Sequence, residues 1–127
     1  MRVFKFGGAS VKDANSVINL KNILLREEQN LVVITSAMGK TTNYLEEIWE
    51  LHLLQETEKA FSKLKFIVSY HKEIYNALQL ESNKAFIYDF NLLCEQLSNF
   101  LSSKNNLKNG SSYDQIVSYG ELWSTTI

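Results

Sequence analysis

Two short apolar runs near the start of the chain have the pattern of β-strands. Residues 2–6 (RVFKF) are bounded by two glycines, and residues 31–35 (LVVIT) form an unbroken run rich in β-branched side chains. The second run is typical of a strand buried on both faces of a parallel sheet. Between them, apolar residues at spacings of three and four predict a helix from Asp13 to about Glu28, with Asp13 as its cap. These residues predict a βαβ unit.

The pattern after residue 42 is helical for most of the remaining chain. Residues 44–54, 57–80 and 84–103 carry apolar side chains at helical spacing. The clearest stripe is that of the third segment, and it indicates packing between helices: Phe86, Phe90, Leu93, Leu97 and Phe100. A polar stretch, Ser102–Ser112, has the composition of a loop. Residues 113–127 are again helical in pattern, with Ser112 or Asp114 as the expected cap.

Composition narrows the class of protein. The 127 residues suffice for one domain, and 45% hydrophobic with 21% charged residues is ordinary for a soluble globular protein. A net charge of −1 gives no reason to expect nucleic acid or an anionic membrane as partner, and no apolar run approaches the ~20 residues of a membrane span. The single cysteine, Cys94, lies in an apolar helical pattern, so we expect a buried inert thiol and a reducing, cytoplasmic location.

The first candidate site follows the first predicted strand. Lys5 stands at the end of that strand, and Gly7 and Gly8 form the turn before the helix. Ligands of open α/β sheets bind beyond the carboxyl ends of the strands, where glycine backbone and a helix N-terminus can receive an anion. A lysine beside them suits the charge that develops during phosphoryl transfer. The alternative is a purely structural turn with a solvated lysine.

The second candidate site, residues 35–43 (TSAMGKTTN), follows the second strand. In a parallel pair the two turns lie at the same edge of the sheet, where both can hold one phosphate chain. Gly39-Lys40-Thr41 is similar to the end of a Walker A loop, but that motif needs an earlier glycine where this chain has Ile34. We therefore reject a Walker site. Thr41 or Thr42 is expected to cap the next helix.

The third candidate site is residues 118–124 (SYGELWS). Gly120 inside a helical pattern costs about 1 kcal/mol relative to alanine, which indicates a packing or ligand reason for its presence. Glu121 beside it can accept a substrate ammonium group. The alternative is a solvated glutamate on an exposed helix face.

The three segments together resemble known sequences. KFGGASV, VVITSAMGKTTN and YDQIVSYGELWST, in this order, resemble the three early signatures of aspartate kinases in the amino-acid kinase family. The resemblance runs from Arg2 to Ile127, is strongest at the two ends, and is weak in the helical middle. It implies an α/β fold, the N-terminal part of a three-layer αβα kinase domain, with residues 1–127 as a partial catalytic domain. It also implies ATP-dependent phosphorylation of the aspartate side-chain carboxylate, the first step toward lysine, threonine and methionine.

The resemblance implies roles for the glycine turn of the first segment. Lys5 matches the lysine that stabilises the transferring phosphoryl group, and Gly7 and Gly8 match glycines whose amides face the phosphates. Ser10 stands where the family has serine or threonine. Ala9 replaces a commoner threonine, which should cost little because the backbone does the binding there.

Roles in the other two segments follow in the same way. Ser36 and Gly39 match the second phosphate-side loop, Thr42 matches a threonine that contacts aspartate, and Glu121 matches a glutamate that holds the substrate amino group. The wording SAMGKTTN departs from the SAMAGVTN form of many relatives, which leaves the glycine register of that loop open. No general base is needed, because the attacking carboxylate is ionised near neutral pH. His52 and His71 are therefore expected to be surface or packing residues.

The resemblance also implies parts that these residues do not supply. ATP and Mg2+ are the expected cofactors, and most of their contacts belong to a later Gly-Arg-Gly-Gly-Ser-Asp-like segment. An arginine for the substrate carboxylate and regulatory domains also lie beyond residue 127. We therefore expect the 127 residues alone to be inactive, to need the C-terminal half of the chain as partner, and to form a homo-oligomer. The alternatives are a kinase for glutamate or acetylglutamate, which the Ser-Tyr-Gly-Glu segment disfavours, or a helical interaction module.

Overall fold

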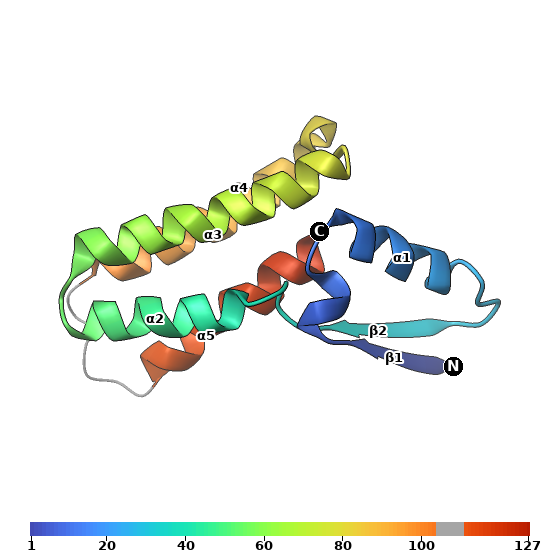
Figure 1. Ribbon diagram of the computed structural model, residues 1–127, viewed down its shortest axis with the longest axis horizontal. Helices are drawn as coiled ribbons and strands as arrows, with labels where there is room; N and C mark the ends of the chain where they lie inside the picture. Colours follow the sequence, from blue (N-terminus) through green and yellow to red (C-terminus); the bar gives the residue numbers. More distant parts are fainter. Residues whose placement is uncertain (104–110) are drawn as a thin grey trace.

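The fold consists of a small parallel sheet at one end and a layer of long helices at the other (Figure 1). The computed structural model describes residues 1–103 and 111–127. Most of the predicted loop Ser102–Ser112 lies outside the described residues. The predicted fold class, a parallel pair of strands followed by a mostly helical segment, is confirmed.

The predicted βαβ unit is present. Strands β1 (Arg2–Phe6) and β2 (Leu31–Thr35) pair in parallel. Between them lie a 3-10 turn, η1 (Gly8–Val11), and helix α1 (Ala14–Leu24). Asp13 caps α1 as expected, because its side chain accepts a hydrogen bond from the Ser16 N–H at 2.8 Å.

Helix α1 is shorter than predicted. It ends at Leu24 instead of continuing to about Glu28. Its apolar stripe ends there, and the next apolar residue, Leu25, is 72% exposed. Glu27 instead forms an ion pair with Arg2 at 2.7 Å, which links the α1–β2 connection to the start of β1.

The predicted burial of β2 on both faces is wrong. Val32, Val33 and Ile34 are 42%, 39% and 48% exposed. Helix α1 runs along one face of the two strands, and among the described elements none runs along the other (Figure 1). The apolar run therefore has the composition of a strand buried on both faces, but among the described elements a helix covers only one of its faces.

Four long helices follow β2, close to the predicted positions. They are α2 (Thr41–Leu53), α3 (Thr57–Ala77), α4 (Lys84–Ser102) and α5 (Ser111–Thr126), with a 3-10 turn, η2 (Leu80–Ser82), between α3 and α4. Within the described residues, none of these helices combines the length and apolar character that a membrane crossing requires.

The predicted caps of α2 and α5 are wrong. Lys40 precedes α2 and makes no side-chain cap, while the Thr41 hydroxyl donates to the Met38 carbonyl at 2.6 Å. Ser112 lies inside α5, where it is buried and accepts a hydrogen bond from the Trp49 indole at 3.2 Å. The Thr41 hydroxyl thus bonds within the β2–α2 connection, whereas the Ser112 hydroxyl contacts Trp49 of α2, and neither caps its own helix.

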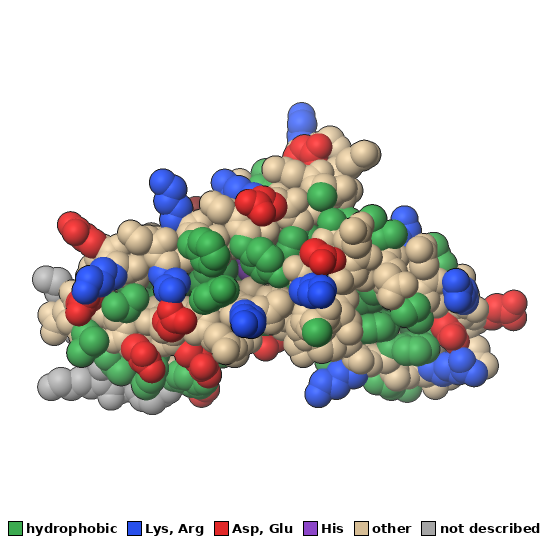
Figure 2. All heavy atoms as spheres, in the orientation of Figure 1, with side chains coloured by type: hydrophobic (Ala, Val, Ile, Leu, Met, Phe, Trp, Pro, Cys, Tyr) green, Lys and Arg blue, Asp and Glu red, His purple; other side chains and the backbone are tan. Residues whose placement is uncertain are grey.

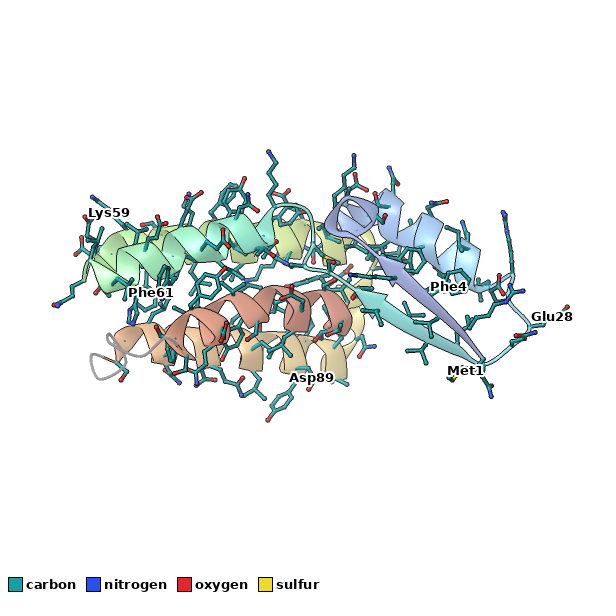
Figure 3. All side chains as sticks on the ribbon, turned by 90° about the horizontal axis from the view of Figure 1, so that it is seen from below. Met1, Phe4, Glu28, Lys59, Phe61 and Asp89 are labelled. Carbon is teal, nitrogen blue, oxygen red and sulfur yellow. The ribbon has the colours of Figure 1, made fainter. Side chains whose placement is uncertain are left out.

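The core lies between the four long helices. Its fully buried members come from all four helices and include Leu45, Ile67, Phe90, Leu97, Ile116 and Trp123. The predicted stripe on α4 contributes Phe86, Phe90 and Leu97 as buried residues, so its packing role is confirmed. Side chains such as Phe61 point between the helices, whereas Lys59 and Asp89 lie on the outside (Figure 3).

A second, smaller apolar cluster joins the two ends of the molecule. Val11 from η1, Met38 from the β2–α2 connection and Ile74 from α3 are each at most 4% exposed and pack together. This cluster fixes the turns after both strands against the helical layer.

Candidate functional site

The two glycine turns predicted from sequence are in direct contact. Both follow the carboxyl ends of parallel strands, the edge at which open α/β sheets bind ligands. The Ser36 N–H donates to the Phe6 carbonyl at 2.9 Å, and the Gly39 N–H donates to the Gly8 carbonyl at 3.0 Å. The first loop (residues 7–12) and the second loop (residues 36–40) thus form one structural unit.

Gly8 is required by close packing between these loops. A Cβ atom on Gly8 would lie 2.7 Å from the Gly39 carbonyl oxygen and 2.8 Å from the Ala37 carbonyl oxygen. Both are backbone atoms, which cannot move aside without separating the loops. Glycine is therefore the residue type that permits this contact.

Gly7 has a different environment. A Cβ atom there would meet nothing within 4 Å, and its backbone is extended, with φ −76° and ψ 171°. The residue is exposed, and its N–H has no backbone acceptor among the described residues. Gly7 thus presents an accessible donor, whereas the Gly39 N–H is already bonded to Gly8.

Lys5 lies on the open face of the sheet. Alternation along β1 puts it on the face opposite Phe4 and Phe6, beside Ile34 of β2. It is exposed, and it forms no ion pair with any of the described residues. Its ammonium group is therefore free to meet an anion near the first loop.

Helix α5 approaches the second loop through Gly120. A Cβ atom on Gly120 would lie 2.8 Å from the Ala37 Cβ and 3.3 Å from the Leu45 Cδ1. Of the two reasons predicted for this glycine, close packing is thus confirmed. The neighbouring Glu121 is exposed and forms no ion pair with the residues described.

The remaining predicted site residues border the same loops. Ser10 is exposed, and its N–H donates to the Gly7 carbonyl at 2.9 Å within the turn. Ser36 begins the second loop and Thr42 lies in the first turn of α2, and both are half-buried. Backbone hydrogen bonds join Gly39 to Gly8 and Ser36 to Phe6, whereas within the described part of the chain no hydrogen bond or ion pair joins the side chains of Lys5, Thr42 and Glu121.

Sequence reasoning missed Tyr70. From α3, its hydroxyl donates a hydrogen bond to the Lys12 carbonyl at the end of the first loop. The same hydroxyl would lie 2.6 Å from a Cβ atom on Gly39, whose φ of +55° already favours glycine. The pattern of α3 gives no signal for this contact, which joins residues 58 positions apart.

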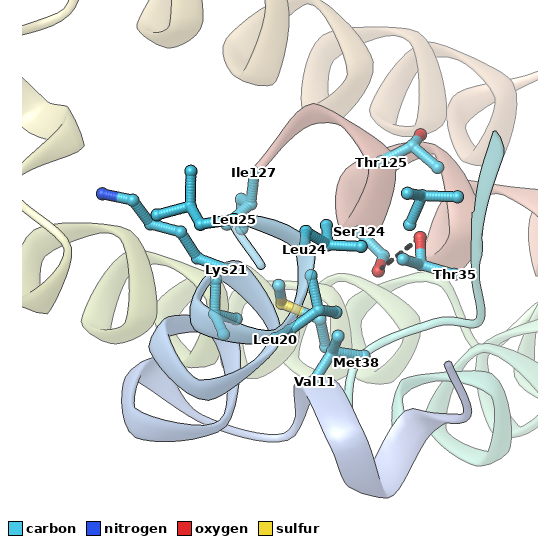
Figure 4. Close-up of a pocket in the computed structure, with 12 residues that line it drawn as sticks. Val11, Leu20, Lys21, Leu24, Leu25, Thr35, Met38, Ser124, Thr125 and Ile127 are labelled. Atoms are coloured by element: carbon cyan, nitrogen blue, oxygen red, sulfur yellow. Dashed lines mark hydrogen bonds between the residues drawn. The ribbon is translucent and has the colours of Figure 1, made fainter. Parts of the chain in front are cut away.

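An apolar cavity of about 600 Å³ lies beside this unit (Figure 4). Helix α1, the end of β2 and the end of α5 line it, with Leu20, Leu24, Met38 and Ile127 among its walls. Its polar side includes the Thr35 and Ser124 hydroxyls, joined at 3.4 Å. None of the predicted phosphate or substrate residues lines it, although Val11 of the first loop and Met38 of the second do.

The charged side chains of the described residues form neither a strongly charged face in the view of Figure 2 nor a cluster of metal ligands. Acidic and basic side chains are interspersed over one face of the molecule (Figure 2), as expected from the near-neutral net charge. No group of three or more potential metal-ligating side chains occurs in residues 1–103 and 111–127.

The histidines fit their predicted packing roles, whereas Cys94, predicted to be buried, is half-buried. His52 and His71 are buried in the helical layer, and burial lowers the pKa of each. Burial raises the pKa of the Cys94 thiol to about 11, so the reactive thiolate is scarce at neutral pH.

Comparison with known proteins shows one consistent relationship. The chain is 30% identical over 130 residues to the chloroplastic aspartokinase 2 of Arabidopsis thaliana, across 98% of this chain and 23% of that protein. Its fold matches E. coli aspartokinase III, solved with lysine and aspartate and also with aspartate and ADP. Each match has a TM-score of 0.84 and 28% identity, covering 98% of this chain and 27% of the other. No family model matches. The chain thus spans about a quarter of the length of these relatives.

Proposed function

The chain belongs to the aspartokinase family, and from this premise we propose that it forms the amino-terminal part of a domain that phosphorylates L-aspartate. ATP is the proposed phosphoryl donor and 4-phospho-L-aspartate the product. This reaction would be the first step toward lysine, threonine and methionine. Residues 1–127 would be a partial catalytic domain, completed by the rest of a longer chain.

The observation that carries this proposal is the direct contact between the two glycine loops at the carboxyl edge of the strands. Phosphoryl transfer needs little covalent help from the protein, so catalysis consists mainly of positioning and charge neutralisation. Two loops joined by a backbone hydrogen bond, with a lysine nearby that forms no ion pair within residues 1–103 and 111–127, can supply both. The E. coli relative solved with aspartate and ADP supports the same substrates here.

Each site residue has a proposed role in this reaction. Lys5 neutralises charge on the transferring phosphoryl group, while Gly7, Gly8 and Ser10 form the phosphate side of the first loop. A carboxylate oxygen of aspartate bonds to the γ-phosphorus as the bond from phosphorus to the ADP oxygen breaks. The carboxylate is already ionised near neutral pH, so no proton has to be removed.

The second loop and α5 have proposed roles in phosphate and substrate binding. Ser36 and Gly39 contribute to the phosphate side; because the Gly39 N–H is bonded to Gly8, Gly39 acts by shaping the loop. Thr42 contacts aspartate, and Glu121 accepts its ammonium group. Mg2+ would enter with the phosphates of ATP, and the enzyme would act as a homo-oligomer. The 127 residues alone are proposed to be inactive, because they provide one side of the site.

Replacing Lys5 with alanine tests the proposed role most sharply. In the full-length protein that carries this chain, Lys5→Ala should lower kcat by at least about 100-fold, the scale of a lost transition-state contact. Circular dichroism and the urea midpoint should stay unchanged, because Lys5 is exposed and unpaired among the described residues. Lys65→Ala, at an exposed position on α3, is the matched control and should keep full activity.

Substrate choice separates the proposal from its alternatives. The wild-type full-length protein should form an acyl phosphate from aspartate, and not from glutamate or acetylglutamate. A preference for either of the latter would assign another amino-acid kinase. Wild-type rates in Lys5→Ala would remove Lys5 from the mechanism.

A further inference from the structure

We propose that Tyr70 is a positioning residue that fixes the spacing between the first and second loops. This inference rests on the proposed function, because the loops are the proposed phosphate-binding elements. Tyr70 lies on α3, outside both loops, yet its hydroxyl contacts the Lys12 carbonyl and lies against Gly39. One side chain of the helical layer thus touches both halves of the site.

The contact with the first loop satisfies a carbonyl group that the local structure leaves without a partner. Lys12 ends the 3-10 turn η1 and directly precedes Asp13, the cap of α1. Carbonyl groups at the end of a helical turn lack donor partners within it and need an outside donor. The Tyr70 hydroxyl is that donor, so its loss would release the junction between η1 and α1.

The contact with the second loop is steric. Gly39 adopts φ +55°, and a Cβ atom there would lie 2.6 Å from the Tyr70 hydroxyl and 3.4 Å from its Cζ. The N–H of the same glycine donates to Gly8 of the first loop. The tyrosine ring therefore limits how far Gly39 can move from the position in which it holds Gly8.

Packing around Tyr70 on α3 holds its side chain in place. One turn further along α3, Ile74 packs with Val11 of the first loop and Met38 of the second. The Tyr70 ring also meets the buried His71 ring edge-on, with centroids 5.3 Å apart. Burial raises the pKa of Tyr70, so the hydroxyl stays protonated and remains a donor at neutral pH.

The kinetic consequence follows from the sensitivity of phosphoryl transfer to alignment. Misplacement of a catalytic group by about 1 Å can cost on the order of 100-fold in rate. Tyr70→Phe keeps the ring and removes only the hydroxyl. We therefore expect about a tenfold fall in kcat, with the KM for aspartate unchanged, since Thr42 and Glu121 lie outside the Tyr70 contacts.

The first experiment compares Tyr70→Phe with Tyr75→Phe in the full-length protein. Tyr75 is a buried residue of the same helix whose hydroxyl makes no hydrogen bond with the described residues. Tyr75→Phe should keep wild-type kcat. A merely structural Tyr70 would show a lower urea midpoint with unchanged kcat, and that result would overturn the inference.

Hydrogen exchange of the Gly39 N–H tests the role of Tyr70 independently of the proposed kinase activity. In the full-length protein, Tyr70→Phe should accelerate exchange of the Gly39 N–H about tenfold or more relative to wild type, because its bond to Gly8 opens more often. If wild type forms no acyl phosphate but this acceleration occurs, the proposed function fails and Tyr70 still positions the loops. Unchanged Gly39 exchange contradicts the role of Tyr70 even in an active kinase.

A double-mutant cycle tests the shared contact. Gly39→Ala places a methyl group against the Tyr70 hydroxyl, and Tyr70→Phe removes that hydroxyl. The urea midpoint of the double variant should therefore lie above the value expected from adding the two single shifts. Additive shifts would show that Tyr70 and Gly39 act independently, which contradicts the proposal.

Discussion

At the scale of single residues, Gly7 and Gly8 are neighbours with different physical requirements. Gly8→Ala should lower the free energy of unfolding by about 2 kcal/mol, because its Cβ would meet two backbone carbonyl oxygens. Gly7→Ala should change it by less than about 0.5 kcal/mol, since its φ suits alanine and its surroundings are open. Urea unfolding of both variants measures the difference. Equal effects of the two substitutions would contradict the loop packing described above.

His71 makes stability depend on pH. Its Nδ1 lies 2.8 Å from the Ile67 carbonyl, and its buried Nε2 has no partner among the described residues. Burial lowers the pKa of His71 below its unfolded value of about 6.5, although the Ile67 bond partly opposes this. The unfolded chain then binds more protons between these two pKa values. The contribution of His71 to the free energy of unfolding should therefore be constant above about pH 6.5 and fall as the pH drops below it.

Urea unfolding at a series of pH values checks this dependence. The slope contributed by one histidine reaches at most about 1.4 kcal/mol per pH unit. His71→Leu should lose that part of the slope, while the part from His52, whose pKa burial also lowers, should remain. Parallel pH profiles for wild type and His71→Leu would show that His71 is not the group responsible.

The sequence predicts single site residues unevenly. Lys5, Gly7 and Gly8 can be proposed from sequence because a lysine in a β-forming run and two glycines directly after it suit an anion site at the carboxyl end of a strand. Tyr70 cannot be found in this way. It is one of six tyrosines, and its contact with Lys12 depends on how α3 packs on the loops, which local patterns do not encode.

At the scale of elements, local pattern predicts the strands and helices better than their ends. The bounds of β1 and β2 follow from the glycine turns and the β-branched run. The Arg2–Glu27 ion pair beyond the end of α1 and the Trp49–Ser112 hydrogen bond at α5 are tertiary contacts, which local pattern does not encode. At α2 the Thr41 hydroxyl bonds locally, to the Met38 carbonyl. The burial of β2 could not be predicted, because an apolar run does not reveal which of its faces is covered.

The packing of α5 on the second loop gives a test at this scale. Gly120→Ala gains about 1 kcal/mol of helix propensity, but its Cβ would lie 2.8 Å from the Ala37 Cβ in a fully packed region. Overpacking of this kind costs about 1–3 kcal/mol, so a net loss of about 1 kcal/mol in unfolding free energy is expected. Urea denaturation measures it.

Two further variants control for helix propensity and for the contact itself. Ser118→Ala, at an exposed position of the same helix, should be neutral or slightly stabilising. Ala37→Gly combined with Gly120→Ala should recover part of the loss by removing the opposing methyl group. A Gly120→Ala variant that is more stable than wild type would show that α5 does not require this close approach.

At the scale of the whole molecule, the chain presents a sheet with one open face. Val3, Val32 and Ile34 lie on this face with Lys5, and the three aliphatic residues are between 42% and 59% exposed. An apolar surface of this kind is typical of a protein interaction site. We propose that the rest of the catalytic domain covers it. In the 127-residue chain by itself, we expect self-association through this face.

One measurement tests the central claim most directly. Aspartyl hydroxamate formation, dependent on ATP and aspartate, should be assayed with the 127-residue chain and with the full-length protein that carries it. The account predicts product from the full-length protein and none above background from the 127 residues, since one side of the site cannot align donor and acceptor. Turnover by the 127 residues alone, or none by the full-length protein, would contradict it.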